Sequence, residues 1–170
     1  MSGVQFIVFI RGLPGAGKST ISNKICNITG YVRIDPDLIP DKYNISLHKE
    51  RMRKYKICLN EAIKSIRNGL SIVWAQPWRK IKNIQLTINR INNLNVKPIL
   101  VNINIPVEES WNRSKNRFYN NRQDFDNYIS KFAVFDNNFK IDSVDIEGTE
   151  DINTNVDRIT KFLRNNVPDE

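Results

Sequence analysis

The chain lacks the residues on which hydrolytic triads and structural zinc sites depend. His48 is its only histidine, and Cys26 and Cys58 are its only cysteines among 170 residues. A Ser-His-Asp triad needs a histidine beside its nucleophile, and a structural zinc ion needs several Cys or His ligands, so both classes of site are disfavoured. We predict two reduced thiols within helices and a histidine on a helix surface.

Long hydrophobic stretches are also missing. The apolar stretch near the N-terminus, Val4 to Ile10, is too short to cross a membrane and leads directly into a glycine-rich segment. We therefore expect no signal peptide, no membrane partner and a cytoplasmic location. Repeats and low-complexity linkers are absent as well, so the length predicts a single domain over residues 1–170.

Acidic residues are fewer than basic ones. The chain has 26 Lys and Arg against 18 Asp and Glu, a formal net charge of +8 and a pI near 9.6. Such a surplus favours a polyanionic partner, although an AT-rich genome explains the abundance of Asn, Ile and Lys equally well. Most basic residues lie within 49–122, whereas 124–151 is mainly acidic. The distribution of charge is therefore more informative than its sum.

One stretch carries a specific motif. The pattern G-x-x-x-x-G-K-S falls on Gly12, Gly17, Lys18 and Ser19, directly after the apolar stretch that predicts a buried strand. An amphipathic helical pattern follows it. A strand, a glycine loop and a helix in this order predict a P-loop that binds a nucleoside triphosphate.

The residue types of this motif explain its chemistry. Glycines let the backbone turn its N–H groups toward phosphate oxygens, and the positive end of the new helix faces the same anion. Lys18 supplies a charge for the outer phosphates, and the Ser19 hydroxyl is expected to bind Mg²⁺. ATP and Mg²⁺ are therefore the expected cofactors, although the motif does not distinguish ATP from GTP. The residues predicted to bind the nucleotide are Gly12, Gly15, Ala16, Gly17, Lys18, Ser19 and Thr20.

The rest of the chain alternates between strand and helix patterns. This alternation predicts an α/β fold of the three-layer P-loop NTPase type, with a mostly parallel five-stranded sheet flanked by helices. Ligands of such sheets bind beyond the carboxyl ends of the strands. After the first strand, further strands are predicted at 31–34, 70–74, 96–105 and 144–146. Helices are predicted at 18–29, 46–68, 80–94, 124–136 and 152–165, and a helix or lid segment at 107–119.

The segment 46–68 is predicted to be a long amphipathic helix capped by Ser46. Its basic face is either simply solvated or a surface for the phosphates of a nucleic acid. The expected core face holds Met52, Tyr55, Leu59, Ala62 and Ile66, and the basic face holds Lys49, Arg53, Lys56, Lys64 and Arg67.

Two aspartates follow the second predicted strand. Asp35 and Asp37 lie on either side of Pro36, where both can point toward the γ-phosphate. A phosphoryl-transfer enzyme needs a base for the acceptor hydroxyl and groups that hold Mg²⁺. Asp37 suits the base, and Asp35 suits metal binding or positioning. Alternatively, the pair only forms a turn.

Three segments together resemble the small P-loop kinases, in particular the branch of polynucleotide 5′-hydroxyl kinases, zeta toxins and adenylylsulfate kinases. They are the P-loop, the segment Ile34-Asp35-Pro36-Asp37, and residues 111–117, which read Trp-Asn-Arg-Ser-Lys-Asn-Arg. The resemblance covers nearly the whole chain in order. It implies a kinase that uses ATP and closes a lid of arginines over the phosphates.

The resemblance also assigns roles to individual residues. Together with the P-loop Lys18, it implies that Asp37 is the catalytic base and that Arg113 and Arg117 contact the phosphates from a lid near 107–123. The segment Gln76-Pro77-Trp78-Arg79 is similar to the family's substrate-contacting loop after the third strand, so Gln76, Trp78 and Arg79 are candidate substrate residues.

Two positions depart from the family's pattern. Many relatives carry Arg three residues after the base, where it contacts the acceptor, and this chain has Pro40 there. Many also carry an acid at the end of the third strand, where this chain has Ala75-Gln76. The acceptor is therefore open, and Mg²⁺ is expected to rely on Ser19 and Asp35.

We expect transfer of the γ-phosphoryl group of ATP to a hydroxyl acceptor. A nucleic-acid 5′-hydroxyl is the first choice, because the basic helix could meet phosphates while Trp78 or Tyr55 stacks on a base. The alternative among enzymes is a small-molecule kinase that acts on a sugar, an antibiotic, a nucleoside or a nucleotide-sugar. The sequence does not predict the oligomeric state.

Two other classes are weighed against the kinase. A regulatory or motor NTPase is disfavoured, since no acid ends the third strand and no Asn-Lys-x-Asp motif follows a strand. A nucleotide-binding module without catalysis is disfavoured by the intact Lys18, Ser19 and Asp37.

Overall fold

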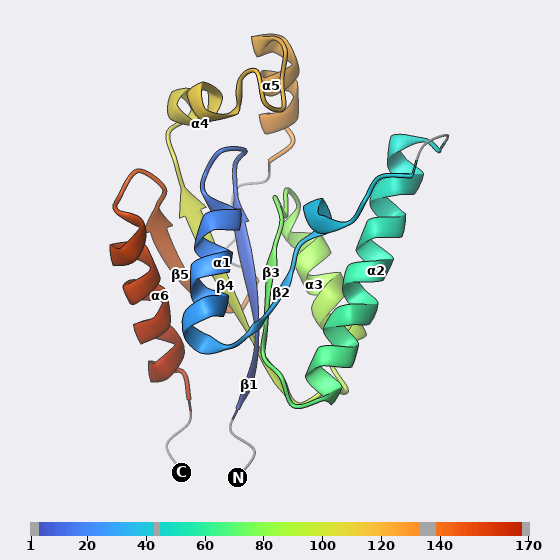
Figure 1. The fold of residues 1–170 in the computed structure, drawn as a ribbon, viewed down its shortest axis with the longest axis vertical. Helices are drawn as coiled ribbons and strands as arrows, with labels where there is room; N and C mark the ends of the chain where they lie inside the picture. Colours follow the sequence, from blue (N-terminus) through green and yellow to red (C-terminus); the bar gives the residue numbers. More distant parts are fainter. Residues whose placement is uncertain (1–3, 43–44, 133–138, 168–170) are drawn as a thin grey trace.

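The computed structural model describes residues 4–42, 45–132 and 139–167. Its strands are β1 (Gln5–Gly12), β2 (Val32–Ile34), β3 (Ile72–Ala75), β4 (Val96–Asn104) and β5 (Asp142–Glu147). They form one sheet in the order β2-β3-β1-β4-β5, in which all neighbouring strands are parallel (Figure 1). The predicted α/β class and five-stranded sheet are confirmed.

Helices lie on both faces of this sheet and at its carboxyl edge (Figure 1). A short 3₁₀ turn, η1 (Pro36–Leu38), follows β2. Among the described helices, none combines the length and the apolar character that a membrane span requires. The α-helices are α1 (Lys18–Thr29), α2 (Leu47–Arg67), α3 (Ile81–Arg90), α4 (Val107–Ser114), α5 (Arg122–Ile129) and α6 (Ile152–Asn165).

The central position of β1 in the sheet accounts for the continuous apolar stretch near the N-terminus. The strand pairs with β3 on one side and β4 on the other, and helices cover both faces of the sheet, so β1 is buried all round. A strand buried on both faces reads as a continuous apolar run rather than as an alternating one. The same pairing places Gly12, the first P-loop glycine, opposite Ile103 at the carboxyl edge of the sheet.

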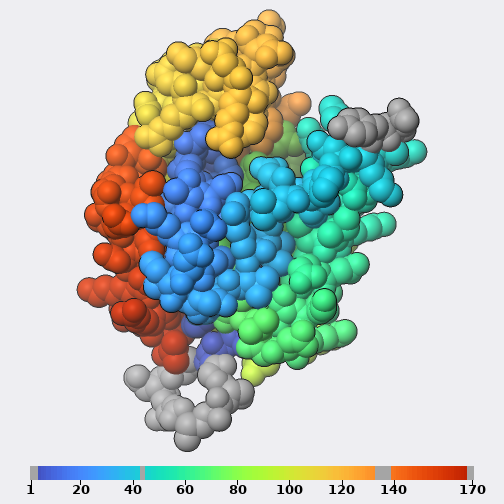
Figure 2. Space-filling view, in the orientation of Figure 1, coloured from blue at the N-terminus to red at the C-terminus, as the bar shows by residue number. Residues whose placement is uncertain are grey.

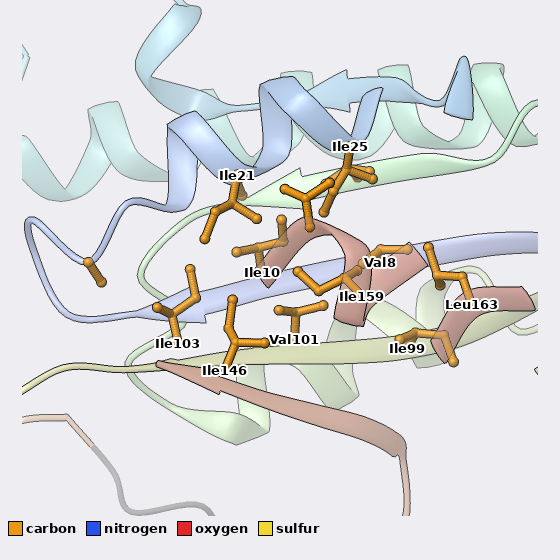
Figure 3. Packing of buried hydrophobic residues seen from close by; sticks show 14 of the residues in the cluster. Val8, Ile10, Ile21, Ile25, Ile99, Val101, Ile103, Ile146, Ile159 and Leu163 are labelled. Carbon is orange, nitrogen blue, oxygen red and sulfur yellow. The ribbon is translucent and has the colours of Figure 1, made fainter. Parts of the chain in front are cut away.

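The core has two layers. On one face, α1 and α6 cover the sheet, and Figure 3 shows Ile21, Ile25 and Ile159 packed against Val8 and Ile10. On the other face, α2 and α3 bury the alternate side chains of β1 together with Trp74 and Trp78. The P-loop therefore projects from the most deeply buried part of the molecule.

Helix ends follow the local chemistry that the sequence predicts. The first helix ends at Gly30, whose φ of 73° is left-handed and whose N–H donates to the carbonyl of Cys26 over 2.8 Å. Helix α2 begins after Ser46, whose side chain accepts a hydrogen bond from the backbone N–H of Lys49. The two cysteines are free thiols, as expected, and His48 is exposed on α2.

Three predictions of secondary structure need correction. The core face of α2 is rotated, because Met52 is 41% exposed and the unpredicted Cys58 is buried. The segment 107–119, predicted as a helix or lid segment, is helical only in its first part, since α4 stops at Ser114. The helix predicted at 124–136 starts and ends earlier, at Arg122 and Ile129, and residues 133–136 lie outside the described residues.

Candidate active site

The P-loop has the backbone geometry that an anion site needs. Gly17 is the N-cap of α1 with a φ of 94°, and Gly15 has a φ of 71°, both in the left-handed region that glycine tolerates best. The first amides of α1 have no partner inside the helix, so they point toward the space above the loop. Ser19 and Thr20 in that first turn are exposed.

Lys18 lies folded over its own loop. Its Nζ donates to the carbonyls of Gly12 and Leu13 over 3.0 and 2.9 Å. Burial lowers the pKa of Lys18 to about 8, and the carboxylates of Asp37 and Asp35 act in the opposite direction. The ammonium group is thus poorly solvated and close to both aspartates, where a phosphate would provide the charge that it lacks.

These observations fit a bound triphosphate with its magnesium ion. The turned glycines, the helix end and the Lys18 ammonium would hold the phosphates, and the exposed Ser19 hydroxyl would hold the metal ion. Gly12 and Ala16 belong to the loop and are buried, so they form its inner side. The described residues contain no cluster of three or more Asp, Glu, His or Cys side chains for a metal, so other Mg²⁺ ligands would be phosphate oxygens and water.

The two aspartates have different environments. Asp35 is 5% exposed; its Oδ2 accepts from Arg33 Nη2 over 2.6 Å and its Oδ1 from the backbone N–H of Asp37 over 2.9 Å. With both oxygens engaged, Asp35 is suited to positioning η1 rather than to direct metal binding. Asp37 is exposed, and within the described parts of the chain its carboxylate has no hydrogen bond. Of the two, Asp37 is therefore the carboxylate whose oxygens are free to meet a ligand.

The helix α4 docks directly on the P-loop. Ser110 is fully buried and its hydroxyl donates to the carbonyl of Pro14 over 2.6 Å. A Cβ placed on Gly15 would lie 2.8 Å from the Cβ of Arg113, so only glycine permits this approach. Figure 2 shows the corresponding yellow atoms of α4 directly above the blue atoms of the loop. Sequence reasoning missed Ser110, whose only signal is a small polar residue four positions before another serine, Ser114, which is also fully buried.

The predicted lid arginines do not share a helix face. Arg113 lies on α4, where its Nε donates to Glu109 over 2.6 Å and its Nη1 to the carbonyl of Gly148 over 2.8 Å. The chain then turns through Asn116, which has a φ of 64°, and Arg117 stacks on the ring of Phe118 at 4.7 Å. Arg113 therefore lies beside the P-loop, whereas Arg117 is exposed and would need to move to reach a phosphate.

The lid has its own small core. Phe125 of α5 is fully buried, and its ring centroid lies 5.4 Å from that of Trp111 and 5.5 Å from that of Tyr119. Arg122 of α5 ties the two helices together through its ion pair to Glu108 of α4, and a second ion pair, to Asp126, lies within α5. The segment predicted as a lid therefore packs together with the whole of α5.

The loop after β3 differs from the expectation. Trp78 is 2% exposed and its ring packs edge-on against Phe9 and Trp74, so it is not available to stack on a nucleic-acid base. Its φ of 47° is unusual for a non-glycine residue, and Arg11 Nε donates to its carbonyl over 3.0 Å. The side-chain oxygen of Gln76 accepts from the Trp74 indole over 3.2 Å.

This strained turn leaves Arg79 at the edge of the sheet. Arg79 is half-buried, and its guanidinium lies 4.8 Å from the centre of the Tyr128 ring. Of the residues predicted in this loop, Trp78 is buried in the core, whereas Gln76 and Arg79 stay partly exposed at this edge.

The basic face of α2 is also less available than predicted. Arg53 forms an ion pair with Glu50, and its Nη2 donates to the carbonyl of Pro40 over 2.6 Å. Lys54 pairs with Asp41 over 2.7 Å. These contacts tie the start of α2 to the loop that follows η1. Arg53 is therefore a structural residue and not a free contact for nucleic-acid phosphates.

Comparison with solved structures gives several matches over nearly the whole chain. A sugar kinase from Janibacter sp. matches with a TM-score of 0.72 and 13% identity, covering 94% of this chain and 95% of its own. A gluconokinase from Sinorhizobium meliloti matches with a TM-score of 0.72 and 12% identity, covering 96% and 94%. The APS kinase CysC of Mycobacterium tuberculosis, solved with AMPPNP and APS, matches with a TM-score of 0.71 and 14% identity, covering 95% and 99%. At such identities these matches establish the fold.

Comparison with curated proteins finds no match. The family model AAA_33, described as an AAA domain, matches residues 7–140, which include the P-loop, the aspartate pair, the loop after β3 and the lid. The chain therefore belongs to this AAA domain family, with the fold of the P-loop kinases.

Proposed function

We propose that this protein transfers the γ-phosphoryl group of ATP to a hydroxyl group of a small molecule. The observation that carries the proposal is geometric: η1 with Asp37 follows β2, and the P-loop with Lys18 follows β1, at the same carboxyl edge of one parallel sheet. The carboxylate of Asp37 accordingly offsets part of the lowering of the Lys18 pKa by burial. Lys18 stands on the donor side and Asp37 on the acceptor side. This is the arrangement that in-line phosphoryl transfer requires.

Each residue then has a defined task. The P-loop amides and Lys18 hold the triphosphate, and Ser19 holds the Mg²⁺ that neutralises its charge. Asp37 accepts the proton of the acceptor hydroxyl as the phosphoryl group leaves ATP. Arg113 stabilises the charge that spreads over the transferring group, and Arg117 joins it when the lid closes. Closure also excludes water and so limits hydrolysis of ATP.

The structure favours a small-molecule acceptor over a nucleic acid. The features that suggested nucleic acid were the basic face of α2 and an aromatic ring, Trp78 or Tyr55, on which a base could stack. The ring of Tyr55 is stacked on Trp74. Arg53 is engaged by Glu50 and Pro40, and Trp78 is buried. The solved relatives named above are described as kinases of sugars, gluconate and APS, which also favours a small acceptor.

The test is a screen for transfer of labelled γ-phosphate to sugars, sugar acids, nucleosides, nucleotides and aminoglycosides, with 5′-hydroxyl RNA and DNA in parallel. Asp37→Asn keeps the size of the side chain but cannot take the proton, so single-turnover transfer should fall by about 10²–10⁴-fold while ATP affinity stays within about twofold. Asp35→Asn should destabilise η1. Transfer by Asp37→Asn at the parent rate would show that Asp37 is not the base.

A further inference from the structure

We propose that Arg51 and Arg79 form an oxyanion subsite for the acceptor, so that the substrate is a hydroxy compound that also carries a phosphate or a carboxylate group. This proposal rests on the proposed function, because it assigns a substrate class to the same site. The two arginines belong to separate elements of the fold, helix α2 and the loop after β3.

Arg51 is placed by the packing of α2. Tyr55 stacks on Trp74 of β3, with ring centroids 5.7 Å apart. Arg51 lies four residues earlier, so it lies on the same face of α2, one turn nearer the start of the helix. That end of α2 is at the carboxyl edge of the sheet, beside η1 (Figure 1). Arg51 therefore lies beyond the end of β3, on the acceptor side.

Arg79 reaches the same region from the loop after β3. The left-handed backbone of Trp78 and the hydrogen bond from Arg11 fix the direction in which the loop leaves the sheet. Backbone strain of this kind persists where the surrounding structure holds a functional side chain in place. Arg79 then lies against the ring of Tyr128, which belongs to the lid helix α5.

Two tyrosines connect these arginines to each other and to the base. Burial raises the pKa of Tyr128, while the charges of Arg79 and Arg51 lower it. The same two arginines act on Tyr119, whose ring centroid lies 5.6 Å from that of Tyr128. Asp37 acts on Tyr128 as well. The guanidinium groups, the phenols and the carboxylate of Asp37 therefore form one electrostatic neighbourhood.

The charges of this neighbourhood are not balanced by the protein. Nearby cations have acidic partners, namely Asp35 for Arg33, Glu50 for Arg53 and Asp41 for Lys54. Arg51 and Arg79 have no carboxylate partner among the residues that the structure describes.

Guanidinium groups bind phosphate and carboxylate with charge-assisted hydrogen bonds, and protonated phenols add further donors. A neutral sugar would leave these donors without an acceptor of matching charge. An anionic group on the acceptor would supply it, and it would be held close to Asp37 without net repulsion.

The first experiment measures anion binding alone. The full chain is saturated with Mg²⁺ and AMPPNP, so that the P-loop is filled, and is then titrated with inorganic phosphate or with acetate by calorimetry. Arg51→Gln and Arg79→Gln should each raise the Kd for phosphate by about tenfold or more. The matched control is Arg67→Gln, the same change at the exposed far end of α2, which should leave the Kd unchanged.

These titrations can overturn the proposal. Absence of phosphate and acetate binding to the nucleotide-saturated protein, or equal affinity in Arg51→Gln, Arg79→Gln and the parent, contradicts the subsite. Tighter binding of phosphate than of acetate assigns a phosphorylated acceptor, and the reverse order assigns a carboxylic acid.

A second experiment separates this proposal from the kinase itself. Glucose, glucose 6-phosphate and gluconate are compared as acceptors of labelled γ-phosphate. The anionic acceptors should be preferred, and KM for them should rise in Arg51→Gln and Arg79→Gln with little change in kcat. If glucose is accepted equally and KM is unchanged, the subsite is wrong and the kinase stands. If no acceptor in any screen takes phosphate, the kinase fails, whereas the phosphate titrations still decide the subsite.

Discussion

The donor and acceptor sides of the site are made in different ways. The donor side is one continuous piece, β1, the glycine loop and α1, and it rises from the deepest part of the core. The acceptor side is assembled from η1, the start of α2, the loop after β3 and the lid, with the lid packed around its own small core. A rigid phosphate cradle thus faces a collection of segments that can vary independently, which is how one fold serves many acceptors.

Removing the donor-side charge should have the largest effect. Lys18→Ala takes away the ammonium group that faces the outer phosphates, and transfer should fall by about 10²–10³-fold or more. Single-turnover transfer and ATP affinity are the measurements. Lys24→Ala is the control, since Lys24 lies on the same helix and bonds to Asn153 instead. Near-normal turnover by Lys18→Ala would show that the loop does not act on the triphosphate in transfer.

The two cores should respond differently to truncation. Ile25 lies in the main core and Phe125 in the core of the lid, and both are fully buried. Ile25→Ala should lower the free energy of global unfolding by about 2–5 kcal/mol. Phe125→Ala should instead loosen residues 107–129 locally, because the rings that pack around Phe125, Trp111 and Tyr119, belong to the lid itself.

Hydrogen exchange and urea unfolding distinguish these outcomes. Loss of amide protection confined to the lid, with a nearly unchanged urea midpoint, is expected for Phe125→Ala. A fall in the global midpoint as large as that of Ile25→Ala would mean that the lid and the body form one cooperative unit.

The pH dependence of ATP binding should follow Lys18. Its pKa in the free protein is about 8 because of burial, against an ordinary value of 10.5. Phosphates bind the protonated form, so the Kd for ATP should rise by up to about tenfold per pH unit above pH 8 and stay flat just below it. Between about pH 8 and pH 10.5, Lys18 is protonated in the unfolded chain but largely neutral in the folded, ligand-free protein. The unfolded state then binds more protons, so the free energy of unfolding should increase as pH rises through this range.

Calorimetry in buffers of different ionisation enthalpy measures the proton that is taken up with ATP. Lys18→Arg is the control, because a guanidinium keeps its charge over this range. A Kd that does not change between pH 7 and pH 9.5 would contradict the lowered pKa.

The smallest effect is expected on the exposed basic face of α2. Lys49 and Lys56 are exposed and lie outside the proposed acceptor subsite. Replacing both with Gln should change kcat/KM for a small acceptor by less than about twofold, as for most surface substitutions. A large loss, together with a flatter dependence of acceptor affinity on salt, would favour nucleic acid as the acceptor instead.

Much of the fold could be predicted because its signals are local. The apolar run of β1, the glycine pattern, the Gly30 end of α1 and the Ser46 cap of α2 all act within a few residues of where they appear. The lid was predicted less well. Its helix stops at Ser114, where the chain turns to let Phe125 reach Trp111, and no local pattern encodes that packing.

The acceptor side shows the same limit at the level of single residues. An aromatic-basic pair, Trp78 and Arg79, predicts stacking on a ligand, yet the tryptophan fills the core and only the arginine remains at the edge. A basic helix predicts free cations, yet Arg53 is held by Glu50. The composition gives the number of charged residues, but ion pairs and hydrogen bonds in the folded protein decide which of them are free to bind a ligand.

The sequence by itself determined the donor side, because a P-loop is a property of consecutive residues: left-handed glycines, a helix start and a lysine placed by covalent geometry. Only the tertiary structure decided the acceptor side, where Ser110 meets Pro14 and Arg79 lies against Tyr128. These residues are far apart in the chain, and the sheet order and helix packing that unite them depend on the burial of the whole core.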